Sequence, residues 1–401
     1  MLDFDTAQAR LAERAIPPSA EDSVPLDALD GRILATDIVA GLDLPPADNS
    51  AMDGYAVRSA DVTSAGTVLP IQQRCFAGQA PEPLRAGHAI RLFTGSIMPE
   101  GADAVLMQED CVEADNRVTL GRVPRPGAYV RAKGEDMACG QTVLRRGTLL
   151  EAPQIAVLAA QGFARAPVFP GLSVGILTTG DELMRPGEPL RPAAVYDSNG
   201  PMLASLCREL GTAPPTVRHV HDDAAAIEQA LAELAGTCDL VLSVGGASVG
   251  EKDLVKPAIE ALGGTLDLWR VRMKPGKPVA LAELHGRPLV CLPGNPVSSF
   301  VVFALLVSPL IRGQQGRHTV FPPVRRGVLT DDRARGGDRE EFLRVQADLT
   351  GPTTRLTPCH QQSSGAISSL NGATGLARIP AGTQTPPGAE VAWYALADWL
   401  R

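Results

Sequence analysis

Two hydrophobic periodicities run along this 401-residue chain. Between residues 172 and 312, short runs rich in apolar residues alternate with segments whose apolar residues recur at helical spacing. The runs predict strands at 172–179, 216–220, 239–244 and 266–273 and a hairpin over 278–292, and the other segments predict helices at 201–210, 223–235, 254–262 and 296–312. This alternation is typical of an α/β fold with a doubly wound, largely parallel sheet.

The flanking segments contain shorter apolar runs. Glycine and proline interrupt residues 55–140 about every 8–12 positions, which predicts a small barrel-like β unit. The tail has "GP", "NG" and "PPG" turns and predicts a second β unit, while helical spacing at 5–15 and 151–163 predicts two short helices. We therefore expect four parts: an elongated N-terminal or linker domain (1–45 with 141–170), a small β domain (46–140), an α/β domain (171–320) and a C-terminal β-barrel domain (321–401).

Composition narrows the class of protein. The net charge of -8, with no basic stretch to offset it, argues against a nucleic-acid binder. The N-terminus "MLDFDTAQARLAER" lacks the apolar core of a signal peptide, and no apolar run approaches the roughly 20 residues of a membrane span. The seven cysteines form no CxxC pair, which favours reduced thiols. We expect a cytoplasmic protein with no membrane partner.

Glycines follow one of the predicted strands, in "DLVLSVGGASVGEKD" (239–253). Gly245 and Gly246 permit a sharp turn and leave backbone amides unshielded, an arrangement that can receive a phosphate. The stretch is not a P-loop, because Glu251 stands where that motif has lysine, and Ala247 excludes GxGxxG. A plain strand-to-helix turn is the alternative interpretation.

Cationic and polar loops follow two other strands. "MKPGKP" holds Lys274 and Lys277 on either side of a rigid turn, where two ammonium groups are tolerable if an anion lies between them; the alternative is two solvated lysines. In "LPGNPVS", Asn295 is expected as helix N-cap and Pro296 as first helical residue, with the Ser298 hydroxyl outward; a capped helix without a ligand is the alternative.

Carboxylates of the same sheet rim have the opposite sign. They are Asp181, Glu182, Asp222 and Asp253. Beside lysines and glycine amides, such carboxylates suit a phosphate bound with Mg²⁺ or another divalent cation. Asp222 could instead only cap the helix that follows it.

Nine stretches in order resemble the MoeA family of molybdopterin molybdenumtransferases, which includes the E domain of gephyrin. They are "DNSAMDGYAV" (48–57), "FTGSIMPEGADAVLMQE" (93–109), "RAKGEDM" (131–137), "TTGDEL" (178–183), "YDSN" (196–199), "GGASVGEKD" (245–253), "MKPGKP" (273–278), "LPGNPVSS" (292–299) and "HQQSSG" (360–365). The resemblance implies a MogA-like α/β domain with small β-barrel-like domains. It also implies insertion of molybdate into the dithiolene of adenylated molybdopterin, with loss of AMP and participation of a divalent cation.

The resemblance also assigns roles, residue by residue. The implied catalytic group is Asp53, Thr94, Asp136, Glu182, Asp222 and Asp253, of which Glu182, Asp222 and Asp253 would bind the metal. The implied substrate-binding residues are Gly245, Gly246, Ser248, Gly250, Lys274, Lys277, Pro293, Asn295, Pro296, Ser298, Arg344 and Ser363. Lys274, Lys277, Ser298, Arg344 and Ser363 among them would form an oxyanion pocket for molybdate. Arg270 stands where relatives often have lysine, so a forked donor replaces a point charge there.

Assembly and partners are likewise implied by the resemblance. It implies a homodimer in which the small β unit of one subunit completes the site on the α/β domain of the other. Further implied partners are the molybdopterin adenylyltransferase and downstream molybdoenzyme maturation proteins. A non-catalytic, gephyrin-like scaffold is the rival function, and a tungstate-inserting relative is a second alternative, since the two oxyanions share shape and charge.

Overall fold

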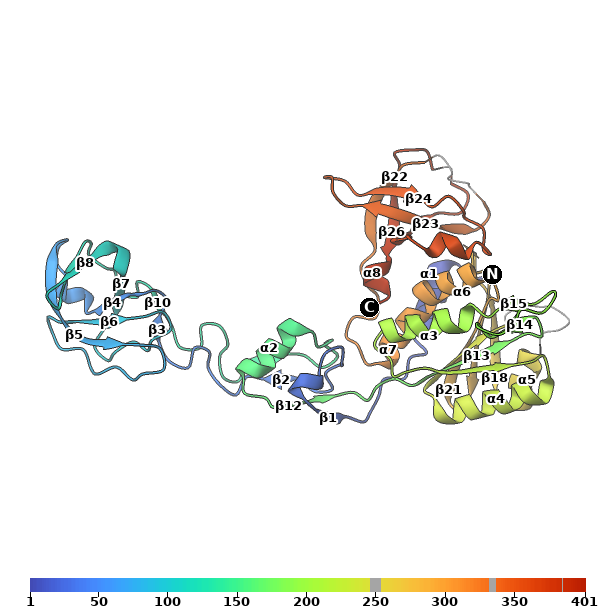
Figure 1. The fold of residues 1–401 in the computed structure, drawn as a ribbon, viewed down its shortest axis with the longest axis horizontal. Coiled ribbons are helices and arrows are strands. Elements are labelled where there is room, and N and C mark those ends of the chain that lie inside the picture. The colour runs from blue at the N-terminus through green and yellow to red at the C-terminus, as the bar shows by residue number, and fades with distance from the viewer. Residues whose placement is uncertain (246–253, 332–336, 384) are drawn as a thin grey trace. The chain divides into compact units, whose positions relative to one another are not determined.

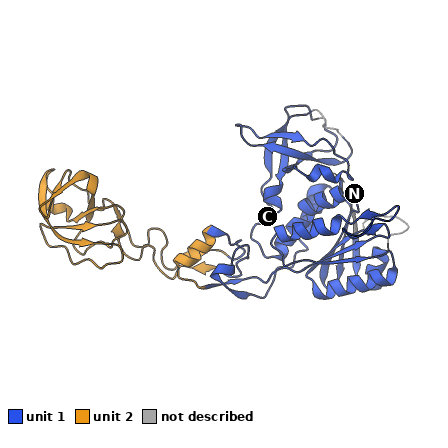
Figure 2. Cartoon of the chain, in the orientation of Figure 1, with its two compact units in different colours: residues 1–36, 146–152, 165–401 blue, residues 37–145, 153–164 orange. Residues whose placement is uncertain are grey.

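A computed structural model describes residues 1–245, 254–331, 337–383 and 385–401. They form two compact units, shown in two colours in Figure 2: residues 1–36, 146–152 and 165–401, and residues 37–145 with 153–164. The α/β part and the C-terminal β part therefore belong to one unit, and the finer division into four domains stays a prediction.

The α/β part is built on a six-stranded sheet in the order β16-β13-β17-β21-β20-β18 (Figure 1). Its strands are β13 (Val174–Thr179), β16 (Thr216–Val220), β17 (Leu240–Val244), β18 (Thr265–Arg270), β20 (Pro278–Leu284) and β21 (Arg287–Leu292). The four strands β16, β13, β17 and β21 pair in parallel, and β20 and β18 continue the sheet antiparallel. The predicted doubly wound, largely parallel sheet is confirmed.

Helices cover both faces of this sheet (Figure 1). They are α3 (Asn199–Glu209), α4 (Ala224–Thr237), α5 (Val255–Ala261), α6 (Pro296–Val302) and α7 (Ser308–Gln314), with a π-helical turn at Phe303–Val307. One apolar cluster joins α4 and α5 to the sheet, and another joins α3, α6 and α7 to its opposite face. The β17 run "LVLSV" is buried along its whole length, as a strand covered on both sides must be.

The described residues contain one helical run, Pro296–Gln314, that is apolar enough to cross a membrane by length and composition. It has 19 residues because the π-helical turn joins α6 to α7 into one continuous helix. The expectation that no apolar segment approaches the length of a membrane span is therefore wrong for this helix. Its apolar window is 94% buried inside the chain. The run is accounted for as a core helix of the α/β part, and core helices pass the same length and hydropathy test.

The predicted strand at 266–273 is wrong, because the chain changes sheets within it. β18 ends at Arg270, and β19 (Met273–Lys274) pairs in parallel with a strand of the C-terminal part. Leu2 lies at the break: its N–H donates to the carbonyl of Arg270, and its carbonyl accepts from the N–H of Arg272, both at 2.8 Å. A backbone segment remote in sequence thus satisfies the groups that leave the first sheet.

The C-terminal part is a closed five-stranded barrel, as predicted. Its strands are β22 (Arg325–Leu329), β23 (Glu340–Asp348), β24 (Arg355–Pro358), β25 (Gly375–Ile379) and β26 (Glu390–Ala395). The row β23-β24-β22-β26-β25 is closed by pairing of β25 with β23. Glycine is required at position 375, because a Cβ there would lie 2.5 Å from the ring of Trp393, which fills the barrel.

The second unit is all-β in its larger part, but its main sheet is an open row rather than a closed barrel. The order is β7-β4-β6-β5-β9-β8, and no pairing joins the two end strands of this fully described segment. The strands are β4 (Gly54–Val57), β5 (Thr67–Cys75), β6 (Ala89–Leu92), β7 (Ala104–Met107), β8 (Cys111–Ala114) and β9 (Arg117–Leu120). Gly54 lets β7 approach, because a Cβ would lie 2.0 Å from the carbonyl oxygen of Leu106.

Short elements complete the two units. The pairs are β1 (Asp22–Pro25) with β12 (Arg165–Val168), β2 (Ile38–Val39) with β11 (Thr142–Leu144), β3 (Asn49–Ser50) with β10 (Val130–Arg131), and β14 (Leu183–Met184) with β15 (Val195–Tyr196). Helix α2 (Ala152–Ala160) matches the helix predicted at 151–163. The two-residue strands are too short to leave a periodic pattern in the sequence.

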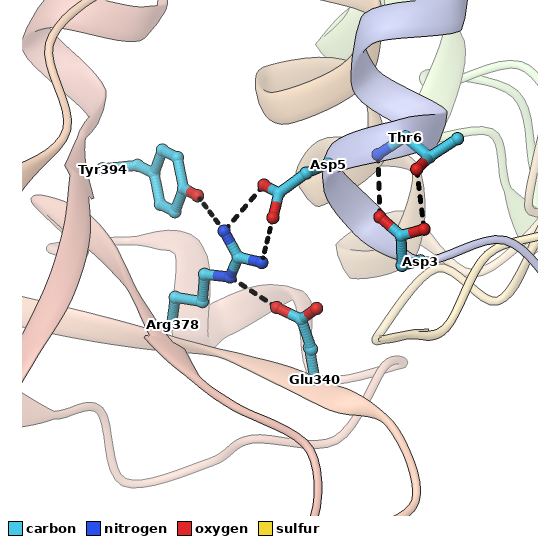
Figure 3. Close-up of polar contacts among 6 residues, drawn as sticks. All are labelled: Asp3, Asp5, Thr6, Glu340, Arg378 and Tyr394. Atoms are coloured by element: carbon cyan, nitrogen blue, oxygen red, sulfur yellow. Dashed lines mark hydrogen bonds and ion pairs between the residues drawn. The ribbon is translucent and has the colours of Figure 1, made fainter.

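Helix α1 (Phe4–Ala12) links the α/β part to the barrel (Figure 3). Asp3 caps it by accepting from the Thr6 N–H at 2.9 Å and from its hydroxyl at 2.7 Å. In the first turn of the helix, Asp5 accepts hydrogen bonds from both terminal nitrogens of Arg378 at 2.8 Å, while the Arg378 Nε donates to Glu340. Burial opposes the charge of Arg378, but the hydrogen bonds to the two carboxylates outweigh it and raise the pKa. The barrel is thereby fixed to α1.

We predict that Arg378→Met destabilises this unit by about 1–3 kcal/mol, because the Glu340 side chain, only 13% exposed, loses its cation. Asp5→Asn should cost less than about 1 kcal/mol, since Asp5 is 66% exposed. All three tryptophans (269, 393 and 399) lie in this unit, so their fluorescence during urea unfolding measures both variants. Equal losses for the two variants would contradict a central role for the Arg378–Glu340 pair.

Candidate functional site

A cavity of about 430 Å³ lies where β17 and β21 end. Predicted site residues in its wall are Gly245, Lys274, Lys277, Pro293, Asn295, Ser298 and Ser363. The remaining wall residues are Pro275, Gly276, Pro278, Leu292, Gly294, Arg339, Gln362 and Ser364. The loops "MKPGKP", "LPGNPVS" and "HQQSSG", which are far apart in sequence, therefore meet at the carboxyl edge of the sheet, the usual ligand position in such folds.

Two glycines give these loops their path. Gly245 ends β17 with φ of 110°, and Gly276 turns the lysine loop with φ of 105°, both in the region that side chains rarely adopt. A Cβ on Gly276 would also lie 2.6 Å from Val302 Cγ2 of α6. The lysine loop is consequently seated on α6. Gly246, Ser248 and Gly250, the other glycine-loop residues of the predicted site, lie outside the described residues.

The two lysines of the cavity differ in their surroundings. Lys274 Nζ lies 3.0 Å from Glu341 Oε1, and the Glu341 side chain is only 10% exposed. Lys277 is exposed and makes no ion pair with any described residue. Lys274 therefore has a protein carboxylate as its counterion, and an anion bound between the two lysines stays a prediction.

The loop before α6 presents polar groups to the cavity. Asn295 is the N-cap and Pro296 opens the helix, as predicted, but the Asn295 side chain makes no capping hydrogen bond. Its neighbours are held instead: Asn199 Nδ2 donates to the Gly294 carbonyl at 2.8 Å, and the Ser299 hydroxyl donates to that of Pro293. The Asn295 amide thus remains available to a ligand.

Arg344 lies behind the cavity wall and is fully buried. Its Nη2 donates to the carbonyls of Gln361 at 2.9 Å and Ser363 at 3.2 Å, so it holds the "HQQSSG" loop. Gln362 adds two bonds to the Arg344 backbone, accepting from its N–H and donating to its carbonyl. Burial lowers the Arg344 pKa, and its Nε and Nη1 have no partner among the described residues. A direct contact with an oxyanion stays a prediction.

The acidic half of the rim follows the neighbouring strands β13 and β16. Glu182 is exposed beside Gly180, where a Cβ would lie 2.7 Å from its carboxylate. The Asp222 N–H donates to Asp181 Oδ1 at 3.2 Å. Asp223 caps α4 by accepting from the Ala226 N–H at 2.8 Å, so the alternative that Asp222 is the capping residue is wrong.

No group of three or more His, Cys, Asp or Glu side chains among the described residues is arranged to hold a metal. Asp253, the third predicted metal ligand, lies outside those residues. Mg²⁺ commonly takes only one or two protein carboxylates and completes its shell with water and phosphate oxygens. Glu182 and Asp222 offer such carboxylates, so the donor chemistry fits a divalent cation, and the metal site stays a prediction.

The second unit brings Asp53 and Thr94 together. Asp53 Oδ1 accepts from both the N–H and the hydroxyl of Thr94 at 2.8 Å. These two bonds lower the Asp53 pKa, and the bond from the backbone N–H has the larger effect. Arg91 contacts the chain next to both residues of this pair: it donates to the Gly54 carbonyl at 3.1 Å, and its guanidinium stacks against the ring of Phe93. Nothing in the sequence patterns pointed to Arg91.

Asp136 lies in a neighbouring loop of the same unit. It is exposed, and its N–H donates to the Leu44 carbonyl at 3.0 Å. The loops are tied together, because Val130 pairs with Ser50 and the Ser50 N–H donates to the Ser96 carbonyl at 2.9 Å. Asp53 therefore contacts Thr94 directly, and backbone hydrogen bonds connect the loop of Asp136 to the loops that carry these two residues.

The sequence reading missed Arg339 as a wall residue of the cavity. Its position depends on the pairing of β19 with β23, and no local pattern announces that pairing. Gln362 and Ser364 lie inside the quoted "HQQSSG" motif, so a signal existed for them.

Comparisons with known proteins agree with this architecture. Residues 2–162 match the MoeA N-terminal region (domain I and II), residues 175–313 a probable molybdopterin binding domain, and residues 326–396 the MoeA C-terminal region (domain IV). The chain is 36% identical to the molybdopterin molybdenumtransferase of Haemophilus influenzae over 86% of this chain and 85% of that one. The corresponding protein of Nostoc sp. is also 36% identical, over 90% and 85%. The molybdopterin biosynthesis moea protein from Pyrococcus horikosii superposes with a TM-score of 0.81 at 30% identity, covering 100% of both chains.

We predict that Thr94→Val raises the Asp53 pKa toward the ordinary value of 3.8 without reaching it, because the hydroxyl donor is lost and the N–H donor remains. Since the folded pKa is the lower one, the stabilisation from this contact is present above the unfolded pKa and is lost as the pH falls through the folded pKa. Carboxyl NMR titration of Asp53 in both proteins provides the measurement. Identical titration curves would show that the hydroxyl contributes nothing.

Proposed function

Since the chain belongs to the MoeA family of molybdopterin molybdenumtransferases, transferases of molybdenum cofactor biosynthesis, we propose that it inserts molybdate into the dithiolene of adenylated molybdopterin and releases AMP. The observation that carries the proposal is the cavity at the ends of β17 and β21, which combines an exposed ammonium, serine hydroxyls and the amide of Asn295, whose side chain makes no capping hydrogen bond. Donors of these kinds bind a compact oxyanion through charge-assisted hydrogen bonds.

The cationic half of the rim would hold molybdate. Lys277 supplies an ammonium without a counterion among the described residues, and Ser298 and Ser363 supply hydroxyls from two different loops. Ser298 is only 4% exposed, so a hydrogen bond from its hydroxyl would form largely out of water, where it is stronger. These groups would orient the oxyanion before the pterin arrives.

The acidic half would receive the adenylate. Glu182 and Asp222, with Asp253, would hold Mg²⁺ or another divalent cation, which supplies charge neutralisation at the phosphoryl group when bound. The acidic loops follow β16 and β13, and the loops that line the cavity follow β17 and β21 and lead into β20, in that order across one sheet. This order supports a substrate lying across the rim, with its phosphate toward the carboxylates and its dithiolene toward the cavity.

Asp53, Thr94 and Asp136 would complete the site from the second unit. Asp53 would act as a charged group rather than as a proton donor at neutral pH, because its bonds from Thr94 lower its pKa below an ordinary value that is already acidic. We propose that this unit serves the α/β part of a second copy in a homodimer. Retention of these side chains supports an enzyme over a gephyrin-like scaffold, which would have no use for them.

Lys277→Ala should raise the molybdate concentration for half-maximal AMP release by about 10- to 150-fold, because one charged hydrogen bond to the oxyanion is lost. High molybdate should restore much of the rate. Asp53→Asn should lose AMP release at every molybdate concentration, since its group is not part of the oxyanion cavity. Molybdate titrations of both variants test this, with Arg326→Ala, an exposed cation of β22, as control. An unchanged midpoint in Lys277→Ala would refute the molybdate assignment, and AMP release with tungstate in the same assay tests the tungstate alternative.

Shared sites in a homodimer predict complementation. Asp53→Asn and Lys277→Ala damage different units, so a mixed dimer should contain one intact combination. We expect mixing after subunit exchange to restore part of the AMP release, up to about half of the wild-type rate per dimer at low molybdate. Exchange is verified by mass spectrometry of tagged chains. Verified exchange without recovery would argue for sites contained in one chain.

A further inference from the structure

The uncompensated positive charges in the wall of the cavity are not those of the two motif lysines together. Lys274, Lys277 and Arg339 are the cations that line it among the described residues. The Lys274 charge is balanced by Glu341 at 3.0 Å. Two wall cations, Lys277 and Arg339, therefore remain without a close, buried counterion among those residues.

Arg339 lines the cavity, but its guanidinium makes only weak contacts with the described residues. Its Nη1 donates to the Met273 carbonyl at 3.4 Å, a long hydrogen bond. Its Nε lies 3.9 Å from Asp338, whose side chain is 90% exposed, so water screens that pair strongly. The Arg339 side chain is itself 31% exposed, which leaves guanidinium donors available to a ligand.

The backbone that follows Arg339 is fixed by strand pairing. Glu340 pairs with Met273 and Glu341 with Lys274 in the parallel contact of β19 with β23. The side chain of Glu340 is bound to Arg378, and that of Glu341 to Lys274. Arg339 directly precedes β23 and these two anchored residues, so its guanidinium lines the cavity next to the paired start of that strand.

We infer that Lys277 and Arg339 carry the two positive charges that hold the oxyanion, while Glu341 fixes Lys274 as a neutralised, oriented donor. A wall with two uncompensated charges favours a tetrahedral dianion over a monoanion of the same shape. This inference rests on the proposed function for the identity of the anion, molybdate. It adds Arg339 as a binding residue and charge matching as the source of selectivity.

The test measures binding of anions without the pterin. Calorimetric titration of the purified full chain, at fixed ionic strength and in buffer free of phosphate, uses molybdate, tungstate and the tetrahedral monoanion perrhenate. We expect the wild-type protein to bind both dianions at least about 10-fold more tightly than perrhenate, because the monoanion lacks attraction equivalent to about one charged hydrogen bond.

Variants then assign the charges. Arg339→Gln and Lys277→Gln should each weaken molybdate about 10- to 150-fold and reduce the preference for molybdate over perrhenate. Glu341→Gln frees the Lys274 charge and should strengthen perrhenate binding relative to Arg339→Gln. Arg326→Gln, a loss of charge on the outer surface of the barrel, should change neither affinity.

Several outcomes would overturn the inference. Wild-type molybdate affinity in Arg339→Gln, with loss in Lys277→Gln, would remove Arg339 from the site. Equal wild-type affinity for molybdate and perrhenate, or no binding of either, would refute charge matching in a preformed cavity. AMP release measured in parallel separates the two proposals: anion binding without AMP release contradicts the reaction but not the anion site, and AMP release that ignores Arg339 contradicts only the inference.

Discussion

The pairing of Met273–Lys274 with Glu340–Glu341 is the contact on which the cavity depends. It carries the lysine loop out of the α/β sheet and makes it the first strand of the barrel sheet, so two folded parts share one wall. The pairing sets Lys274 against Glu341 and brings Arg339 to the cavity. Backbone hydrogen bonds give this arrangement a fixed register, which flexible side chains alone would not.

The N-terminal segment stabilises this contact from two directions. Leu2 satisfies the backbone where the chain leaves β18, and Asp5 binds the arginine that also holds Glu340. Phe4 packs on Phe342 of β23, with ring centroids 4.6 Å apart. The N-terminal segment thus supports the backbone beside β19 and packs on β23, and a small shift there would move the cationic wall.

The chemistry is divided between groups of different electrostatic character. The cavity of the first unit is lined by cations, hydroxyls and amides, whereas the second unit offers the Asp53 carboxylate, whose pKa is lowered by its contacts with Thr94. The proposed substrate carries both a phosphate and a dithiolene that takes up the oxyanion, and we propose that it uses both kinds of surface. Keeping them on separate units lets each be preorganised without the direct attraction of its opposite charges.

The sequence by itself determined the α/β class, the barrel at the C-terminal end, the family and the loops that meet at the rim, because strand runs, turn residues and ordered motifs are local properties of the chain. Only the tertiary structure decided that Lys274 is paired with Glu341, that the Asn295 side chain makes no capping hydrogen bond, that Arg344 is buried behind the wall and that Arg339 reaches the cavity. It also decided that the strand predicted at 266–273 divides between two sheets. Each of these outcomes depends on which remote strand or loop supplies a partner, and the free energy of that choice comes from pairing and burial across the whole unit rather than from neighbouring residues.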